Sequence, residues 1–197
     1  SRGRIPRARG TWIGQPFRGH RTGFPSIDIK SVGAGGGSIA RVDPGGILHV
    51  GPQSAGAVPG PVCYNMGGTE PTLTDAALVL GYLDAEFFLG GSMKLNLESA
   101  KSVIKNKVAG PLGLGIPEAA AAIVSVVTEN MVQAISEITV NQGIDPADAV
   151  LIGGGGAAGL NSTWTARRLR CPSVLIPETG AGLSAYGAMI SDLSREY

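Results

Sequence analysis

The sequence predicts an α/β protein, and two parts of the chain carry that prediction. The last third alternates strand-like apolar runs at 149–152 and 173–176 with helical patterns at 161–169 and 183–193. This alternation is typical of an α/β layer with parallel strands. Nearer the start, a glycine-rich turn at 33–38 lies between short segments that have the apolar pattern of β-strands. Together they predict strands joined by a glycine loop and followed by strand-helix units.

The residues around the glycine-rich turn predict a three-stranded β-meander. Its strands are expected at 26–32, 38–43 and 47–50, with a Pro-Gly-Gly turn between the last two. Proline presets φ for such a turn, and glycine accepts the left-handed backbone that it requires. The next segment, 51–68, is rich in proline and glycine and also holds small apolar residues. We therefore expect a packed loop with little regular structure there.

Helices are predicted in the middle of the chain, at about 75–83, 97–109 and 117–141. Thr74 is expected to cap the first helix, and Asp75 then lies in its first turn, where a carboxylate stabilises the helix dipole. A Gly-Pro pair is expected to end the second helix. A meander with a glycine loop, then helices, then strand-helix alternation is the order expected for one lobe of an actin-like nucleotide-binding domain.

Composition and charge limit the class of protein. A chain of 197 residues suits one domain or one lobe of a larger one, and its formal net charge of +1 gives no overall attraction to nucleic acid or to an anionic membrane. No apolar run approaches the roughly 20 residues that span a bilayer, so we expect no membrane segment. Residues 1–22 hold six arginines and no acid. They are expected to form a partly ordered basic extension that lies against a partner, and 23–197 to form the folded lobe.

The cysteines and histidines predict no metal site. Cys63 and Cys171 are far apart and have no His or Cys neighbours at metal-ligand spacing. His20 and His49 likewise have no second ligand nearby, so a zinc site built within this chain is not expected. Two unpaired cysteines are typical of reduced thiols in a cytoplasmic protein.

Two glycine clusters are the candidate binding segments. In the first, at 33–38, the uncovered N–H groups of a turn form a concavity that suits an anion, with phosphate as the expected guest. The alternative is a tight hairpin whose glycines only relieve steric crowding. The second cluster, at 153–159, follows a predicted strand and opens a helix. That order places N–H groups and the positive end of a helix dipole beside whatever binds there.

Four motifs resemble, in sequence and in order, those of the hydantoinase A family. They lie at 33–40, 50–57, 59–64 and 71–76. The family includes ATP-dependent hydantoinase and oxoprolinase subunits and the nucleotide-binding subunits of acetone and acetophenone carboxylases. The resemblance extends from Gly23 to the end of the chain. The segments at 153–161 and 19–25 look closer to the aromatic ketone carboxylase branch than to the hydantoinases.

The resemblance implies a fold and a set of binding residues. The fold is the second lobe of an actin-like ATPase, in which nucleotide lies between two lobes. The loop 33–38 then donates to the β and γ phosphates, and 154–157 lies against the adenosine. Asp75 is either a helix-start charge or a contact to magnesium or a partner, and no catalytic residue is assigned. The implied nucleotide-binding residues are Gly33, Ala34, Gly35, Gly36, Gly37, Ser38, Gly153, Gly154, Gly155, Gly156, Ala157 and Asn161.

The function implied by the resemblance is ATP-dependent activation of bicarbonate and of a ketone enolate by phosphoryl transfer. ATP with Mg²⁺ or Mn²⁺ is the expected cofactor. The expected partners are the first ATPase lobe, in the same polypeptide or in a separate subunit, and a hydantoinase B-like subunit. Two alternatives remain: hydrolysis of a cyclic amide in the hydantoinase or oxoprolinase branch, and a nucleotide-binding or scaffolding module without turnover of its own.

Overall fold

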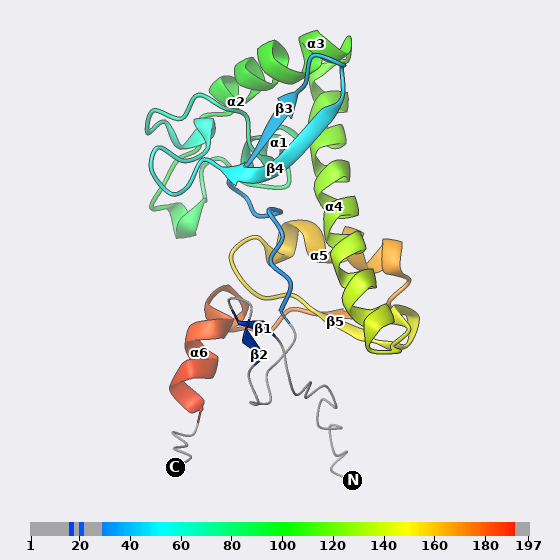
Figure 1. Ribbon diagram of the computed structural model, residues 1–197. Helices are drawn as coiled ribbons and strands as arrows, with labels where there is room; N and C mark the ends of the chain where they lie inside the picture. The colour runs from blue at the N-terminus through cyan, green and yellow to red at the C-terminus, as the bar shows by residue number, and fades with distance from the viewer. Residues whose placement is uncertain (1–15, 18–19, 22–28, 192–197) are drawn as a thin grey trace.

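The computed structural model describes residues 16–17, 20–21 and 29–191. Most of the predicted basic extension and part of the predicted first strand lie outside these residues. Two regions are joined by one long helix, α4 (Ile116–Asn141). As Figure 1 shows, one region gathers around the upper half of α4, and the start of the last third of the chain lies beside its lower half, with the final helix set apart from α4. Two residue pairs, β1 (Pro16–Phe17) and β2 (His20–Arg21), form a short antiparallel ladder.

The upper region contains a β-hairpin where a three-stranded meander was predicted. Strands β3 (Ser38–Val42) and β4 (Leu48–Ser54) pair antiparallel, but residues 29–32 form no strand, so that part of the prediction is wrong. The open edge of β3 is taken instead by residues 71–72. Ala40 N donates to the Pro71 carbonyl, and Ile39 bridges to Thr72.

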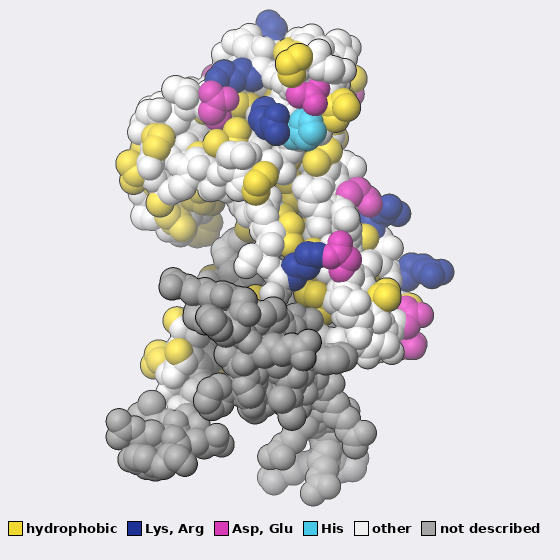
Figure 2. All heavy atoms as spheres, in the orientation of Figure 1, with side chains coloured by type: hydrophobic (Ala, Val, Ile, Leu, Met, Phe, Trp, Pro, Cys, Tyr) yellow, Lys and Arg dark blue, Asp and Glu magenta, His cyan; other side chains and the backbone are white. Residues whose placement is uncertain are grey.

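The turn of the hairpin forms as its Asp-Pro-Gly-Gly sequence predicts. Asp43 Oδ1 accepts hydrogen bonds from the N–H groups of Gly45 and Ile47, both at 2.9 Å, and Gly46 has φ +79°. The other carboxylate oxygen lies 2.8 Å from His49 Nε2, and this hydrogen bond holds the pKa of Asp43 below its usual value. In Figure 2 the histidine lies beside acidic and basic side chains on this face of the hairpin.

The first helix, α1 (Leu73–Val79), starts two positions before the predicted range because its cap is Thr72, and Thr74 is therefore not the cap. Thr72 and Asp75 form a capping box, in which each side chain bonds the backbone N–H of the other residue. Helix α2 (Leu97–Ile104) is capped by Asn96 as predicted, since Asn96 Oδ1 accepts from Ser99 N at 2.9 Å.

Helix α2 does not end where the Gly-Pro pair predicted. It continues through a wide π turn, Lys105–Ala109, into the short helix α3 (Gly110–Leu112). Pro111 comes directly after the π turn, in which Gly110 N donates to Lys105 O, and it lies in the first turn of α3. Gly113, with φ +66°, ends the segment.

Helix α4 is the longest element, and its upper half supplies much of the core. Ala119, Ala120, Ile123, Val124 and Val127 are buried and pack with residues of β3, β4, α1 and the π turn. Among the described residues, α4 alone is long and apolar enough to cross a membrane by length and composition. That corrects the expectation that no stretch approaches this limit. A core helix can have the same length and composition as a membrane-spanning one. The buried side chains of its upper half make α4 a core helix.

The last third follows the predicted alternation. Its elements in order are β5 (Val150–Ile152), α5 (Ala158–Leu169), β6 (Ser173–Leu175) and α6 (Leu183–Ile190). Strands β5 and β6 pair in parallel, with Leu151 opposite Val174. The strand-helix-strand unit predicted from the sequence is therefore confirmed, and its glycine cluster lies at the carboxyl end of β5.

Candidate nucleotide site

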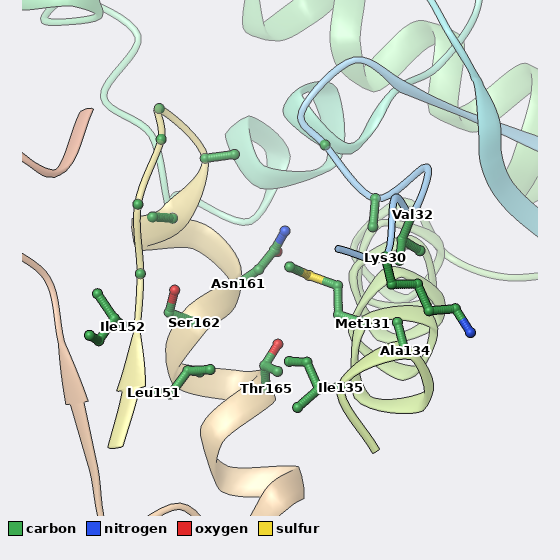
Figure 3. A pocket seen from close by; sticks show the side chains of 18 of the residues that line it. Lys30, Val32, Met131, Ala134, Ile135, Leu151, Ile152, Asn161, Ser162 and Thr165 are labelled. Carbon is green, nitrogen blue, oxygen red and sulfur yellow. The ribbon is translucent and has the colours of Figure 1, made fainter. Parts of the chain in front are cut away.

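A cavity of about 550 Å³ lies between α4, α5 and both glycine-rich segments. Figure 3 shows side chains of α5 and α4 facing one another across it, with the two loops above. Most of its lining is apolar, and α4 contributes the apolar side chains on one side. The residues that line it are Lys30, Val32, Ala34, Gly35, Met131, Ala134, Ile135, Ile138, Leu151, Ile152, Gly153, Gly154, Gly155, Gly156, Ala157, Ala158, Asn161, Ser162 and Thr165.

The second glycine cluster is fixed by backbone hydrogen bonds to the segment after β6. Gly153 N donates to Leu175 O at 2.9 Å, and Gly155 N donates to Gly180 O at 2.7 Å. Gly155 has φ +95°, a conformation that favours glycine. A Cβ on Gly154 would lie 2.7 Å from Leu183 Cδ2. Packing against α6 therefore accounts for the lack of a side chain at Gly154, independently of any ligand.

Only part of the first glycine cluster reaches the cavity. Ala34 and Gly35 line it, but Gly33, Gly36, Gly37 and Ser38 do not. The other glycines are packed on protein atoms: a Cβ would meet Pro52 Cα at 2.4 Å from Gly33, Thr74 Oγ1 at 2.7 Å from Gly36, and Ser54 Oγ at 2.8 Å from Gly37. The side chain of Ser38 is buried as well.

The loop is held to α1 through Gly36. The carbonyl oxygen of Gly36 accepts hydrogen bonds from both the backbone N–H and the hydroxyl of Thr74, each at 2.9 Å. These bonds fix the part of the loop next to Gly35. For Gly33, Gly36 and Gly37 the simpler alternative of relieving steric crowding is thus sufficient.

Three glycines in the cavity have space around them. A Cβ on Gly35, Gly155 or Gly156 would meet no atom within 4 Å, although the φ of +95° at Gly155 disfavours a side chain there. Among the described residues, the N–H groups of Gly35, Gly154 and Gly156 donate to no protein acceptor. Uncovered N–H groups beside empty space are the feature that an anion-binding loop requires. The role of these residues in nucleotide binding stays a prediction. Gly35 and Gly156 are the best positions for a test, because a side chain there would not clash with the protein.

Three lining residues, Lys30, Ser162 and Thr165, carry polar groups that the sequence reasoning missed. Lys30 lines the cavity and pairs with Glu137 of α4. Thr165 lies one turn after Asn161 on the same face of α5, and both are almost fully buried. The spacing of four residues from Asn161 was a signal that placed Thr165 on the predicted ligand face. No sequence pattern pointed to Lys30.

Asp75 lies in the first turn of α1, as expected for a charge at a helix start, which was the first of its two predicted roles. It is fully buried, and its Oδ1 accepts from Cys63 N at 2.7 Å. Its Oδ2 accepts from Thr72 N at 2.9 Å, Thr72 Oγ1 at 2.8 Å and Val62 N at 3.3 Å. The carboxylate is enclosed and does not line the cavity, so this geometry gives no support to a magnesium contact. The neighbouring Cys63 thiol has a raised pKa because it is buried.

Helices α4 and α5 are also joined outside the cavity. Glu129 Oε1 and Oε2 accept from Arg168 Nε at 2.5 Å and Nη2 at 2.9 Å, a bidentate pair. The hydrogen bonds from Arg168 hold the pKa of Glu129 below its usual value. Among the described residues no three His, Cys, Asp or Glu side chains are grouped so as to hold a metal ion.

Comparison with known proteins gives the family. A family model described as Hydantoinase/oxoprolinase matches residues 4–197. The chain belongs to the hydantoinase/oxoprolinase family. Caprolactamase subunit alpha of Pseudomonas jessenii is 48% identical over 177 residues, 90% of this chain and 25% of that protein. The acetophenone carboxylase gamma subunit of Aromatoleum aromaticum is 45% identical over 168 residues, 85% of this chain and 23% of that protein. The family resemblance read from the sequence motifs is thus confirmed.

Two solved structures have the same α/β fold. The crystal structure of the ATP-dependent caprolactamase from Pseudomonas jessenii matches with a TM-score of 0.80 and 48% identity, over 88% of this chain and 25% of that one. A nucleotide-free structure of acetone carboxylase matches with a TM-score of 0.80 and 33% identity, over 88% of this chain and 24% of that one. The chain therefore spans about a quarter of the length of these hydantoinase/oxoprolinase family members.

Proposed function

We propose that this chain is the second lobe of an actin-like ATPase and that its cavity binds ATP. One observation carries the proposal: two glycine-rich segments that are far apart in the sequence line a single cavity, with Gly35 from one and 153–156 from the other. Two family members of known structure, a caprolactamase and an acetone carboxylase, are ATP-dependent. The cavity volume of about 550 Å³ also falls in the range of small-molecule sites.

The residues present fit the phosphates of ATP, and this proposal places 154–157 beside the phosphates, where the family resemblance implied the adenosine. The N–H groups of Gly35, Gly154 and Gly156 are uncovered, and α5 begins directly after the second cluster, so its positive end faces the same space. Fixed donors of this kind stabilise charge on a phosphoryl group as it is transferred. Lys30 adds a positive charge at the rim when it leaves Glu137. We expect Mg²⁺ or Mn²⁺ to be held mainly by the phosphates of the nucleotide.

The reaction that we propose is ATP-dependent carboxylation of a ketone, in a complex with a first ATPase lobe and a hydantoinase B-like subunit. ATP activates bicarbonate and the enolate by phosphoryl transfer, and this chain holds the nucleotide. The motif at 153–161 and the 45% identity to an acetophenone carboxylase subunit support this branch.

A second candidate is ATP-dependent opening of a cyclic amide. Its support is the 48% identity to a caprolactamase subunit, together with 37% identity to 5-oxoprolinase of Dictyostelium discoideum. The two candidates share the nucleotide site proposed here and differ in the group that ATP activates.

Phosphate release by the native complex separates the candidates. The complex is supplied with ATP and, in separate reactions, with acetophenone or acetone plus bicarbonate, with caprolactam, or with 5-oxoproline. We expect release that requires both a ketone and bicarbonate. Release with a cyclic amide and no bicarbonate supports the second candidate instead. ATP binding without substrate-dependent release would favour a nucleotide-binding or scaffolding module.

A further inference from the structure

One positively charged side chain lies between two hollows of the molecule. Lys30 lines the cavity of about 550 Å³ and also a neighbouring hollow of about 230 Å³ beside α4. Among the described residues, it is the only charged one that lines the larger cavity. In the smaller hollow it pairs with Glu137, and the two side chains are 40% and 46% exposed. Because the lysine stem is long and flexible, its ammonium group can turn to either side of this border.

The ammonium group of Lys30 is held outside the cavity by this pair. Figure 3 shows the side chain pointing away from Asn161 and Ser162, which lie on the opposite wall. Glu137 has a second partner, since its Oε1 accepts from Gln133 Nε2 at 3.4 Å while its Oε2 faces Lys30. The carboxylate is also partly exposed to solvent. It therefore remains solvated and hydrogen-bonded when Lys30 leaves.

A phosphate in the cavity is a stronger partner for Lys30 than Glu137 is. An exposed ion pair contributes little, because water screens both charges and two long side chains lose freedom. A phosphate group carries more charge, and the largely apolar lining of the cavity screens it less. The uncovered N–H groups of Gly35 and Gly156 face the same space. A polyanion bound there attracts the ammonium group away from α4.

We propose that Glu137 controls the affinity of this chain for ATP, because it competes with the phosphates for Lys30. The proposal rests on the proposed function. Lys30 adds an attraction only for a ligand that carries phosphate, so it favours the nucleotide over the nucleoside. Glu137 reduces the fraction of molecules in which Lys30 is free to turn into the cavity, and the apparent affinity falls by that fraction.

The test is a double-mutant cycle of Lys30→Met and Glu137→Gln in the native protein, titrated with a nonhydrolysable ATP analogue and with adenosine. Each substitution removes one charge at similar volume. Lys30→Met should weaken binding of the analogue about tenfold, because a charged hydrogen bond to phosphate is lost. Glu137→Gln should tighten it about threefold, because an exposed ion pair no longer has to break. Adenosine has no phosphate, and neither substitution should change its affinity.

The cycle separates competition for Lys30 from a general effect of charge. In the Lys30→Met background, Glu137→Gln should have no effect on binding of the analogue, because no ammonium group remains to be released. Glu129→Gln is the matched control. It removes the same charge from the same helix at a similar exposure of 48%, and neither Glu129 nor its partner Arg168 lines the cavity. The control should bind the analogue as the wild type does.

Three results overturn the proposal. In the first, Lys30→Met binds the analogue as tightly as the wild type, or Glu137→Gln binds it no more tightly. In the second, Glu137→Gln tightens binding equally with and without Lys30, or Glu129→Gln has the same effect, which indicates a long-range effect of charge. In the third, Lys30→Met weakens binding of adenosine and of the analogue equally, which indicates disturbed packing. A wild-type protein that does not bind the analogue contradicts the proposed function itself.

Discussion

The upper and lower regions of the molecule differ in how far they cover their own apolar residues. Leu73, Ile104 and Ile123 in the upper region are completely buried. In the lower region Ile152 on β5 is 58% exposed and Leu175 on β6 is 52% exposed. The upper region thus gains its stability from contacts within the chain. The lower region, which carries the second glycine cluster, leaves apolar strand residues open to contact with further protein or with ligand.

The glycines of the two regions also differ in how closely they are packed. In the upper region Gly33, Gly36 and Gly37 are required by close packing on protein atoms. In the lower region Gly156 is surrounded by open space, and so is Gly35, at the point where the upper loop reaches the cavity. A glycine-rich sequence can therefore serve folding at one position and ligand binding at the next.

The largest expected effect is that of Asp75→Ala, which removes the centre of the hydrogen-bond network in the upper region. Four buried or partly buried donors from Val62, Cys63 and Thr72 lose their acceptor. We expect a loss of about 3 kcal/mol in the free energy of unfolding, measured by denaturant titration of the native protein. Asp84→Ala, which removes a single exposed acceptor for Glu86 N, is the control and should cost less than about 0.5 kcal/mol. An Asp75 variant of normal stability but altered magnesium dependence would restore the metal role.

Hydrogen exchange measures the contrast between the regions directly. The amides of Ala76 and Leu80 in and after α1 should be protected by about 2 kcal/mol more than those of Gly153 and Gly155, because the latter lie in a region with less buried apolar area. Addition of ATP should slow exchange at Gly153 and Gly155 and leave α1 unchanged. Equal protection of both regions without nucleotide would contradict the predicted difference in their local stability.

A smaller effect is expected where α1 holds the first glycine loop. Thr74→Val removes the hydroxyl that donates to Gly36 O and should lower the free energy of unfolding by about 1 kcal/mol. Thr74→Ser keeps the hydroxyl and should recover most of the loss in the same denaturant titration. If Thr74→Ser is as unstable as Thr74→Val, packing of the methyl group matters and the hydrogen bond does not.

The smallest effect concerns the pair that joins α4 to α5. Because Arg168 lowers the pKa of Glu129 in the folded state, the pair stabilises the fold above the pKa that Glu129 has in the unfolded chain. That contribution is lost as the pH falls through the lower, folded-state pKa. Both side chains are largely exposed, so the effect on the unfolding midpoint should be slight. The check is the unfolding midpoint of the wild type and of Glu129→Gln between pH 7 and pH 3. The prediction fails if the two proteins have the same pH profile.

Much of the fold could be predicted from local sequence signals. Turn residues fixed the β3–β4 hairpin, Asn96 fixed the start of α2, and the apolar periodicity fixed β5, α5 and β6. Long-range competition caused the errors. The segment 71–72 takes the edge of β3 that the first predicted strand needed, and no local pattern could reveal that.

The candidate site was predictable to a similar degree. The glycine segments and Asn161 follow from motif and helix-start patterns. Lys30 and the apolar wall of α4 do not, because they reach the cavity only through tertiary packing. The sequence also could not separate Gly35, which faces open space, from Gly36, which packs against Thr74.

The most direct measurement is ATP binding by native protein carrying Gly35→Val or Gly156→Val. Neither substitution meets protein atoms within 4 Å at its Cβ, so each fills the proposed phosphate space without disturbing the fold. Gly187→Val, also in open space but outside the cavity, is the matched control. Calorimetric titration with a nonhydrolysable ATP analogue should show at least a tenfold loss of affinity for the two cavity variants and none for the control. Unchanged affinity in both cavity variants would contradict the assignment of this cavity to ATP.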